Sequence, residues 1–237
     1  MSIFIITGAG ASQDSGIQTY RGENGYYETT NKYKNTKSAE QDLDFMNLYK
    51  APHVIWDRLL PLYEQIVNHE PGPTYKKLAE IISQSKECML VTQNIDGYSL
   101  HLHDMIDKET TTLDVIELHG TYKTISCITC MKTIEVTKEF IELHIKILNC
   151  ECGGIIRPDI VLYGEELDDR KTTQIFTYIK KKRPSTVYVI GTSLQFPYLR
   201  KMINSCKQLG AKVIHINPIQ PDHLPKNEKW ITSFEKN

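Results

Sequence analysis

The chain has 237 residues, a formal net charge of −1 and 40% hydrophobic residues, which allows one large domain, or a large domain with a small one, and a substantial core. The near-neutral charge excludes nucleic-acid binding through overall charge, so we expect no direct nucleic-acid partner. No apolar run approaches the roughly 18 residues of a membrane span, and no basic region precedes a signal-type apolar segment, so we expect no membrane partner and an intracellular protein, cytoplasmic or alternatively nuclear.

Strands and helices alternate along most of the chain. Short apolar runs predict strands, and apolar residues at helical spacing predict helices. In chain order, the elements are a strand at residues 2–7, helices at 53–68 and 74–84, strands at 88–94 and 113–120, an apolar segment at 159–165, a helix at 171–182, a strand at 186–193, a helix at 198–210 and a strand at 212–217. Pro61 is expected to kink or end the first of these helices. The basic run at 180–183 is expected to be a solvated helix end rather than a binding patch.

This alternation predicts the α/β class, with a doubly wound parallel sheet. A cysteine-containing segment interrupts the alternation, so we expect an inserted small domain at residues 121–156. Residues 26–75 are expected to form a second, mostly helical insertion. The main domain would then be discontinuous and would comprise residues 1–25, 76–120 and 157–237.

Four of the six cysteines form two close pairs. Cys127 and Cys130 are followed, after 19 residues, by Cys150 and Cys152. Two such pairs are typical of a zinc ribbon, and four thiolates predict a closed, structural zinc site. Two disulfides or buried thiols are the alternatives, and an intracellular location favours zinc over disulfides. The single residue between the cysteines of the second pair is a tighter spacer than the usual two.

Glycine or polar residues follow five of the predicted strands. Because the carboxyl ends of parallel strands meet at one edge of the sheet, these residues predict a single ligand site at the point where the strand order reverses. Gly8 and Gly10 would let the backbone approach a pyrophosphate closely. A glycine-rich turn without a ligand is the alternative, because the spacing departs from the common G-x-G-x-x-G pattern. The residues at the strand ends are Gly8, Ala9, Gly10, Ser12, Gln93, Asn94, Ile95, Asp96, His119, Gly191, Thr192, Ser193 and Asn217.

Several long motifs carry a family resemblance. The segments GAGASQDSGIQTYRG, TQNIDG, ELHG, the two cysteine pairs, GGIIRPDIVLYGEEL, GTSL and IN follow one another as they do in sirtuins. The chain therefore resembles the sirtuin family from residue 3 to about residue 218. The resemblance implies a Rossmann-like large domain, a small zinc domain and a cleft between them. It also implies NAD-dependent removal of acyl groups from protein lysines, with nicotinamide and O-acyl-ADP-ribose as products.

The same resemblance implies roles for individual residues. His119 would be the general base, and Asn94 would act with it. Tyr20 would replace the family's phenylalanine beside the reacting sugar, and Arg21 would lie in the mobile cofactor loop. The residues expected to contact NAD are Gly8, Ala9, Gly10, Ser12, Tyr20, Arg21, Gln93, Asn94, Ile95, Asp96, Gly191, Thr192, Ser193, Asn217 and Pro218.

Substrate contacts are also implied by the resemblance. An acyl-lysine protein or peptide would pair, as an added strand, with the segment containing Val161, Tyr163, Gly164 and Glu165. A plain core strand is the alternative for this segment. Sirtuins that remove acidic acyl groups resemble one another in a Tyr-x-x-Arg pair, which here aligns with Leu59 and Leu62. We therefore expect an acetyl group or another neutral acyl group as the substrate.

The chemistry expected of His119 fits its residue type. A base with a pKa near neutral is needed to deprotonate a ribose hydroxyl, and histidine has such a pKa. A histidine that only fills the core is the alternative for this position. For the whole chain, ADP-ribosyl transfer or NAD hydrolysis is the alternative enzyme activity, and an NAD-binding module without turnover is the alternative from another class.

The chain departs from the sirtuin pattern at a few positions. Gln18 stands where the family usually has proline, and Tyr75 stands where it usually has histidine. Tyr98 and Ser99 replace a Leu-His pair. The segment that usually closes the adenine side of the site is expected to be shortened or changed, around residues 230–233.

Overall fold

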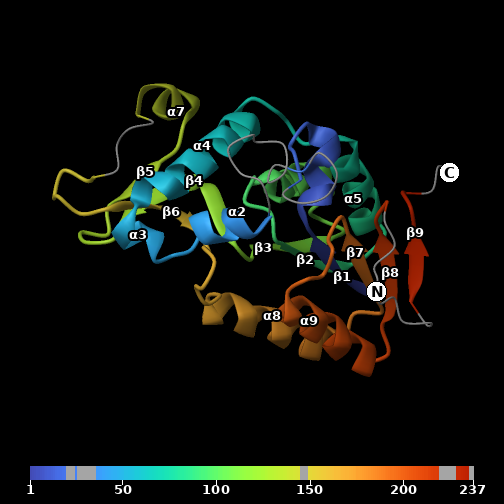
Figure 1. Cartoon of the computed structure of the whole chain (residues 1–237). Helices are drawn as coiled ribbons and strands as arrows, with labels where there is room; N and C mark the ends of the chain where they lie inside the picture. Colours follow the sequence, from blue (N-terminus) through green and yellow to red (C-terminus); the bar gives the residue numbers. More distant parts are fainter. Residues whose placement is uncertain (20–24, 26–35, 145–148, 219–227, 235–237) are drawn as a thin grey trace.

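The computed structural model describes residues 1–19, 25, 36–144, 149–218 and 228–234. Six strands form one parallel sheet in the order β3-β2-β1-β7-β8-β9 (Figure 1). The strands are β1 (Ser2–Thr7), β2 (Glu87–Thr92), β3 (Thr112–Glu117), β7 (Thr186–Ile190), β8 (Lys212–Ile216) and β9 (Lys229–Ile231). From β1 the chain adds two strands on one side and the other three on the opposite side. The predicted doubly wound parallel sheet is thus confirmed, and its order reverses between β1 and β7.

Both faces of this sheet are covered, which explains the continuous apolar runs in its strands. In β1, Ile3 and Ile5 belong to one core cluster, whereas Phe4 and Ile6 belong to the other. Figure 1 shows α8 and α9 on one face and α4 and α5 on the opposite side of the sheet. The sheet therefore separates two apolar layers and leaves its strand ends for the site.

The long helices begin with residues that favour a first turn. α4 (Pro52–Val67), α5 (Pro73–Ser83) and α9 (Pro197–Gln208) each have proline there, where its missing N–H costs nothing. α8 (Asp169–Lys182) follows Asp168, whose carboxylate accepts a hydrogen bond from the Arg170 backbone N–H. The last turn of α8 carries the predicted basic residues at the negative end of the helix dipole.

α4 continues through Pro61, which is therefore not the end of a helix. The apolar face of α4, with Ile55, Leu59, Leu62 and Ile66 in the core, holds the helix against the rest of the protein. The remaining short helices are η1 (Ala9–Ser15), α2 (Thr36–Asp42), α3 (Asn47–Lys50), η2 (Tyr98–His101), α6 (Leu102–Met105) and α7 (Lys138–His144). No helix among the described residues is long and apolar enough to span a membrane.

A second, antiparallel sheet lies between β3 and α8 in the chain. It contains β4 (Gly120–Cys127), β5 (Thr133–Glu135) and β6 (Ile156–Ile160), in the order β5-β4-β6. The indole N–H of Trp56 in α4 donates to the Ile156 carbonyl in β6, at 3.3 Å. The exact domain boundaries stay a prediction, but the cysteine segment does form a small sheet of its own.

The strand β9 was not predicted. It pairs with β8, and the indole N–H of Trp230 donates to the Asn217 carbonyl at 2.9 Å. Next to it, Nε2 of His215 lies 2.5 Å from Glu228, which also pairs with Lys207. The sequence predicts a shortened or changed segment around residues 230–233. In the structure, part of this segment forms the sixth strand, β9, beside Asn217.

Candidate functional site

Three glycines allow two backbone segments to cross closely where the strand order reverses. The N–H of Gly8 donates to the Ile190 carbonyl at 3.0 Å, and the N–H of Gly10 donates to the Gly191 carbonyl at 2.9 Å. A Cβ on Gly10 would lie 2.7 Å from the Gly191 Cα. Gly191 has a φ of +59°, and a Cβ there would lie 2.4 Å from the Ala11 nitrogen. From the sequence, these glycines are expected to let the backbone approach a ligand. The structure shows that they also let the loops after β1 and β7 approach each other closely.

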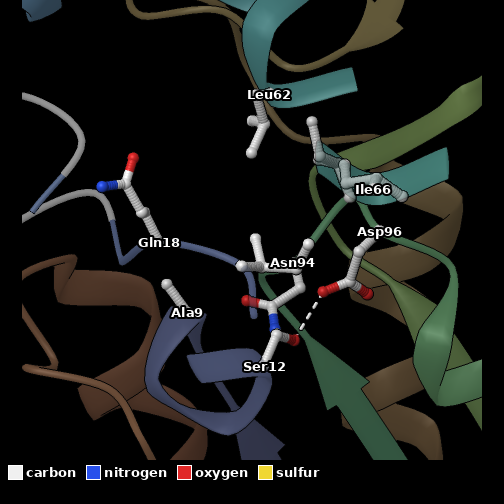
Figure 2. Close-up of a pocket in the computed structure, with 9 residues that line it drawn as sticks. Ala9, Ser12, Gln18, Leu62, Ile66, Asn94 and Asp96 are labelled. Carbon is white, nitrogen blue, oxygen red and sulfur yellow. Dashed lines mark hydrogen bonds between the residues drawn. The ribbon is translucent and has the colours of Figure 1, made fainter. Parts of the chain in front are cut away.

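Ser12 is the centre of a buried hydrogen-bond network. Its Oγ donates to Asp96 Oδ2 at 2.6 Å and accepts from Asn94 Nδ2 at 2.9 Å (Figure 2). The Tyr75 hydroxyl lies 2.8 Å from the same oxygen. Because Ser12 has one hydrogen, which Asp96 accepts, the Tyr75 hydroxyl must be a donor. The Ser12 hydroxyl is therefore saturated and fixes the Asn94 amide.

Asp96 is fixed from two sides. Its second carboxylate oxygen accepts the Tyr98 backbone N–H at 3.0 Å. Burial raises the pKa of Asp96 above its ordinary value, and the hydrogen bonds from Ser12 and Tyr98 oppose that shift. The ring of Tyr98 also packs edge-on against Tyr75, with centroids 5.8 Å apart. Of the departures from the sirtuin pattern, Tyr75 thus bonds to the serine that holds this carboxylate, and the ring of Tyr98 packs against Tyr75.

We expect replacement of Tyr75 with phenylalanine to lower stability by about 1 kcal/mol, because Ser12 loses a buried hydrogen-bond partner while the ring packing stays. For a chain of this size, that corresponds to a fall in melting temperature of roughly 2–4 °C. Thermal unfolding of both proteins measures it. Tyr49→Phe is the matched control, since Tyr49 is 61% exposed, and it should have no effect. Equal melting temperatures for the Tyr75 variant and the parent would contradict the network.

A pocket opens above this network. Figure 2 shows Leu62 and Ile66 of α4 across the pocket from Asn94, with Ala9 and Gln18 at its side. The lining residues are Ala9, Ser12, Ile17, Gln18, Leu62, Ile66, Asn94, Ile95 and Asp96. Leu59 and Leu62 are predicted together, and both are buried in the core, with 2% and 3% of their surface exposed, but only Leu62 is among the residues that line this pocket. Ile66 was missed, although it lies one turn beyond Leu62 on the same face of α4.

Gln18 has a specific partner. Its backbone N–H donates to Gln65 Oε1 at 3.3 Å, and Gln65 Nε2 donates to Gln18 Oε1 at 3.3 Å. Proline at position 18 could make neither contact, because it lacks both the N–H and the amide. The departure at Gln18 therefore joins the start of the predicted cofactor loop to α4. Tyr20 and Arg21, further along that loop, lie outside the described residues.

Side chains also connect the other strand ends. Gln93 Nε2 donates to Thr192 Oγ1 at 2.8 Å and to the Thr7 carbonyl at 3.2 Å. Asn217 Nδ2 donates to the Thr192 carbonyl at 3.1 Å. The ends of β1, β2, β7 and β8 are thus joined along one edge of the sheet. Two further predicted contacts, Ser193 and Pro218, are exposed in the loops that follow β7 and β8.

His119 follows β3 and is held at both ring nitrogens. Nδ1 lies 3.0 Å from the Gln93 carbonyl, and Nε2 lies 2.5 Å from the Tyr198 hydroxyl. A carbonyl only accepts, so Nδ1 carries the hydrogen and Nε2 offers its lone pair. Burial lowers the pKa of His119 to about 4, the bond to Gln93 opposes this shift, and the Lys171 ammonium adds to it. The imidazole is therefore neutral at pH 7, as a general base must be.

The segment that follows β6 is tied to its own chain. The N–H and carbonyl of Tyr163 pair with Leu43 and Phe45, each at 3.0 Å. The N–H of Val161 donates to the His119 carbonyl at 2.8 Å. Gly164 has a φ of +85° and packs against the ring of Phe45. The N–H of Glu165 donates to the Leu162 carbonyl at 3.1 Å. Three of the four predicted substrate residues thus already use backbone groups, and one of them, Val161, is joined to His119.

Glu165 has a structural partner that the sequence did not indicate. Its carboxylate accepts two hydrogen bonds from the Arg157 guanidinium, at 2.6 and 2.8 Å, and one from the Leu162 N–H at 2.8 Å. The pKa of Arg157 is raised by this carboxylate. The ion pair fixes the turn at the end of the segment.

The four predicted zinc ligands come together. Their Sγ atoms all lie within 4.8 Å of one another. Cys127 and Cys152 are 3.5 Å apart at sulfur, and Cys130 and Cys150 are 3.7 Å apart. A tetrahedral site with Zn–S bonds of about 2.3 Å has S–S edges of about 3.8 Å, so the residues fit a structural Zn²⁺ ion. All six cysteines of the chain are free, which rules out the disulfide alternative in this structure.

Comparison with known proteins gives a consistent result. Residues 8–197 match the model of the Sir2 family. The NAD-dependent protein deacylase 2 of Pseudomonas syringae pv. tomato is 30% identical over 97% of this chain and 89% of its own length. The NAD-dependent protein deacetylase of Thermodesulfovibrio yellowstonii is 34% identical over 91% of this chain and 79% of its own length.

Solved structures agree with these relatives. A mutant Sir2 homologue in complex with 2′-O-acetyl ADP ribose has a TM-score of 0.78 and 27% identity, over 97% of this chain and 85% of that chain. A complex of a Sir2 homologue with NAD has a TM-score of 0.76 and 26% identity, over 97% of this chain and 82% of that chain. The likeness therefore extends over both sheets.

Proposed function

The chain belongs to the Sir2 family, and we propose that it is a protein deacylase whose reaction consumes NAD, frees a lysine amine and yields nicotinamide and O-acyl-ADP-ribose. The observation that carries this proposal is His119, a partly buried, neutral imidazole whose Nε2 lone pair lies at the edge shared by the predicted cofactor residues. The names of both relatives support the activity. The structural neighbour with bound acetyl ADP ribose supports the product.

The residues at the sheet edge fit NAD. Side chains larger than hydrogen at Gly8, Gly10 or Gly191 would collide with neighbouring backbone or side chains. The pocket lining includes the hydrogen-bonded polar side chains of Ser12, Asn94 and Asp96 beside its apolar residues. Bound there, NAD supplies a ribose whose bond to nicotinamide is broken and whose hydroxyl loses a proton. The protein's task is to hold that ribose and to accept the proton.

The side chains of Asn94 and Asp96 are already held in place by hydrogen bonds, as residues that position the ribose should be. The bond to Ser12 fixes the nitrogen side of the Asn94 amide, and its oxygen points toward Ala9 (Figure 2). Ser12 and the Tyr98 N–H hold the Asp96 carboxylate in place. Groups fixed before the ligand binds lose little further freedom on binding, which favours catalysis by positioning.

The proton is accepted at Nε2 of His119. Gln93 holds the ring in the required tautomer through Nδ1–H, and the same carbonyl stabilises the imidazolium that forms. The nearby Lys171 ammonium disfavours that cation. The resulting base is weak but correctly oriented and remains unprotonated across physiological pH.

We further propose that the substrate peptide binds beside residues 161–165. The N–H of Val161 bonds to the His119 carbonyl, so this segment lies next to the base. Tyr20 and Arg21, outside the described residues, are proposed to close over the cofactor. The division into a main domain, a helical insertion and a zinc-binding insertion also remains a proposal.

A neutral acyl group should be preferred. The apolar side chains that line the pocket include Ile17, Leu62 and Ile66, and no cationic side chain is among its lining residues in the described part of the chain. A buried carboxylate without a partner is costly, so we expect kcat/KM for a succinyl-lysine peptide to be at least about tenfold below that for the acetyl peptide. Leu62→Arg should narrow this ratio. Equal rates for the two peptides in the parent enzyme would contradict the preference.

The activity itself is tested with NAD⁺ and an acetyl-lysine peptide, with nicotinamide and O-acetyl-ADP-ribose measured together. The proposal requires both products to depend on the acetyl peptide. Nicotinamide release that is independent of the peptide would instead indicate NAD hydrolysis. Transfer of ADP-ribose to protein would indicate an ADP-ribosyltransferase.

A further inference from the structure

Tyr198 contacts the base although no sequence motif pointed to it. Its hydroxyl lies 2.5 Å from Nε2 of His119, and it belongs to the first turn of α9, which follows the loop after β7. The next residue, Leu199, is fully buried and fixes this turn in the core. The backbone of Tyr198 is therefore held by a helix that packs in the core rather than by a loop.

Two aromatic rings border His119. Phe196 and Tyr198 stack on one another with centroids 5.3 Å apart and an interplanar angle of 11°. Both meet His119 edge-on, at 5.7 and 6.1 Å between centroids. Burial raises the pKa of Tyr198 well above its ordinary value, and the nearby Tyr163 raises it further. Tyr198 thus remains a protonated donor at physiological pH.

The contact uses the atom on which the reaction depends. Nδ1 of His119 carries its hydrogen toward Gln93, so the Tyr198 hydroxyl must donate to Nε2. A ring nitrogen offers a single in-plane lone pair, and a ribose hydroxyl needs the same lone pair to transfer its proton. Tyr198 and the ribose therefore cannot both bond to Nε2.

We propose that Tyr198 is a positioning residue that occupies Nε2 of His119 and competes with the ribose hydroxyl for it. This inference rests on the proposed deacylase function. Each productive encounter with NAD must first break one hydrogen bond between neutral groups, which reduces apparent affinity roughly twofold to tenfold. The hydroxyl occupies Nε2 while the ribose is absent, and its departure makes this nitrogen available to the ribose hydroxyl.

The test is the Tyr198→Phe variant, which removes the hydroxyl and retains the ring. We expect KM for NAD to fall roughly twofold to tenfold while kcat is not reduced. A hydrogen bond to the neutral imidazole disfavours its protonation, so its loss should move the acid limb of kcat/KM to higher pH. The acid limb of kcat should stay, because Tyr198 has already left Nε2 in the complex. Tyr178→Phe, whose hydroxyl donates to the Ile3 carbonyl, is the control and should change neither limb.

The Tyr198→Phe substitution leaves the other titratable groups near His119 in place. Lys171 on α8 faces His119, and Tyr163 faces Tyr198. A direct NMR titration of the His119 ring in enzyme without NAD should likewise give a higher pKa for Tyr198→Phe than for the parent. This measurement reports the contact even if the protein has no deacylase activity.

Each outcome is decisive. A fall in kcat of tenfold or more in Tyr198→Phe would show that the hydroxyl passes the proton on, which would overturn competition. An unchanged KM together with an unchanged His119 titration would also overturn it. If the parent enzyme shows no peptide-dependent turnover, the proposed function fails, and the NMR titration alone then decides whether Tyr198 holds Nε2.

Discussion

His119→Ala is expected to lower kcat for deacylation by about 100- to 10,000-fold, the usual contribution of a positioned general base. The geometry supports a large effect, because the ring is held through Nδ1 by Gln93 and kept neutral by burial. Alanine leaves the ribose hydroxyl without an acceptor at this point. Steady-state rates with saturating NAD⁺ and acetyl-lysine peptide measure the loss.

The matched control is His53→Ala, since His53 is exposed in the first turn of α4. It should retain parental kcat. Thermal unfolding of both variants separates a chemical effect from a loss of structure. A His119→Ala enzyme that is folded and keeps kcat within about threefold of the parent would contradict the assignment of His119 as the base.

Much of the main sheet could be predicted because its strands are buried on both faces. The run from Ser2 to Thr7 has five buried residues of six, so its apolar character alone marks a strand. β9 lacks such a signal. It has three residues, Lys229, Trp230 and Ile231, each exposed or partly exposed, and it depends on pairing with β8. Its existence follows from long-range pairing that local sequence does not record.

In the candidate site, residues at the strand ends could be predicted, whereas several residues on helices could not. The rule that ligands bind beyond the carboxyl ends of parallel strands placed Gln93 near Thr192 correctly, and the structure joins them by a hydrogen bond. Tyr75, Ile66 and Tyr198 come from helices, and their contacts depend on how each helix is rotated against the sheet. That rotation is set by packing in the core, which a single sequence does not specify.

A short segment of chain runs from the four cysteines to the loop that carries His119. Cys127 ends β4, Cys150 lies before β6, and β6 leads into Val161, whose N–H bonds to the His119 carbonyl. Loss of zinc should therefore disturb the position of His119 through the short segment that joins β6 to Val161. Structural zinc stabilises small modules directly, because the binding free energy is also folding free energy.

Cys150→Ser is accordingly expected to reduce bound zinc from one ion per chain to well below one, to lower the melting temperature by roughly 10 °C and to abolish most deacylation. Three remaining thiolates cannot close the tetrahedral site, so the small antiparallel sheet loses the stabilisation that bound zinc supplies. Metal analysis, thermal unfolding and the peptide assay measure the three effects. Cys206→Ser is the control, because Cys206 is buried in the core away from the zinc ligands and should retain one zinc per chain even if it loses some stability. A Cys150→Ser protein that still binds one zinc ion with full activity would refute both the ligand assignment and the coupling of this site to His119.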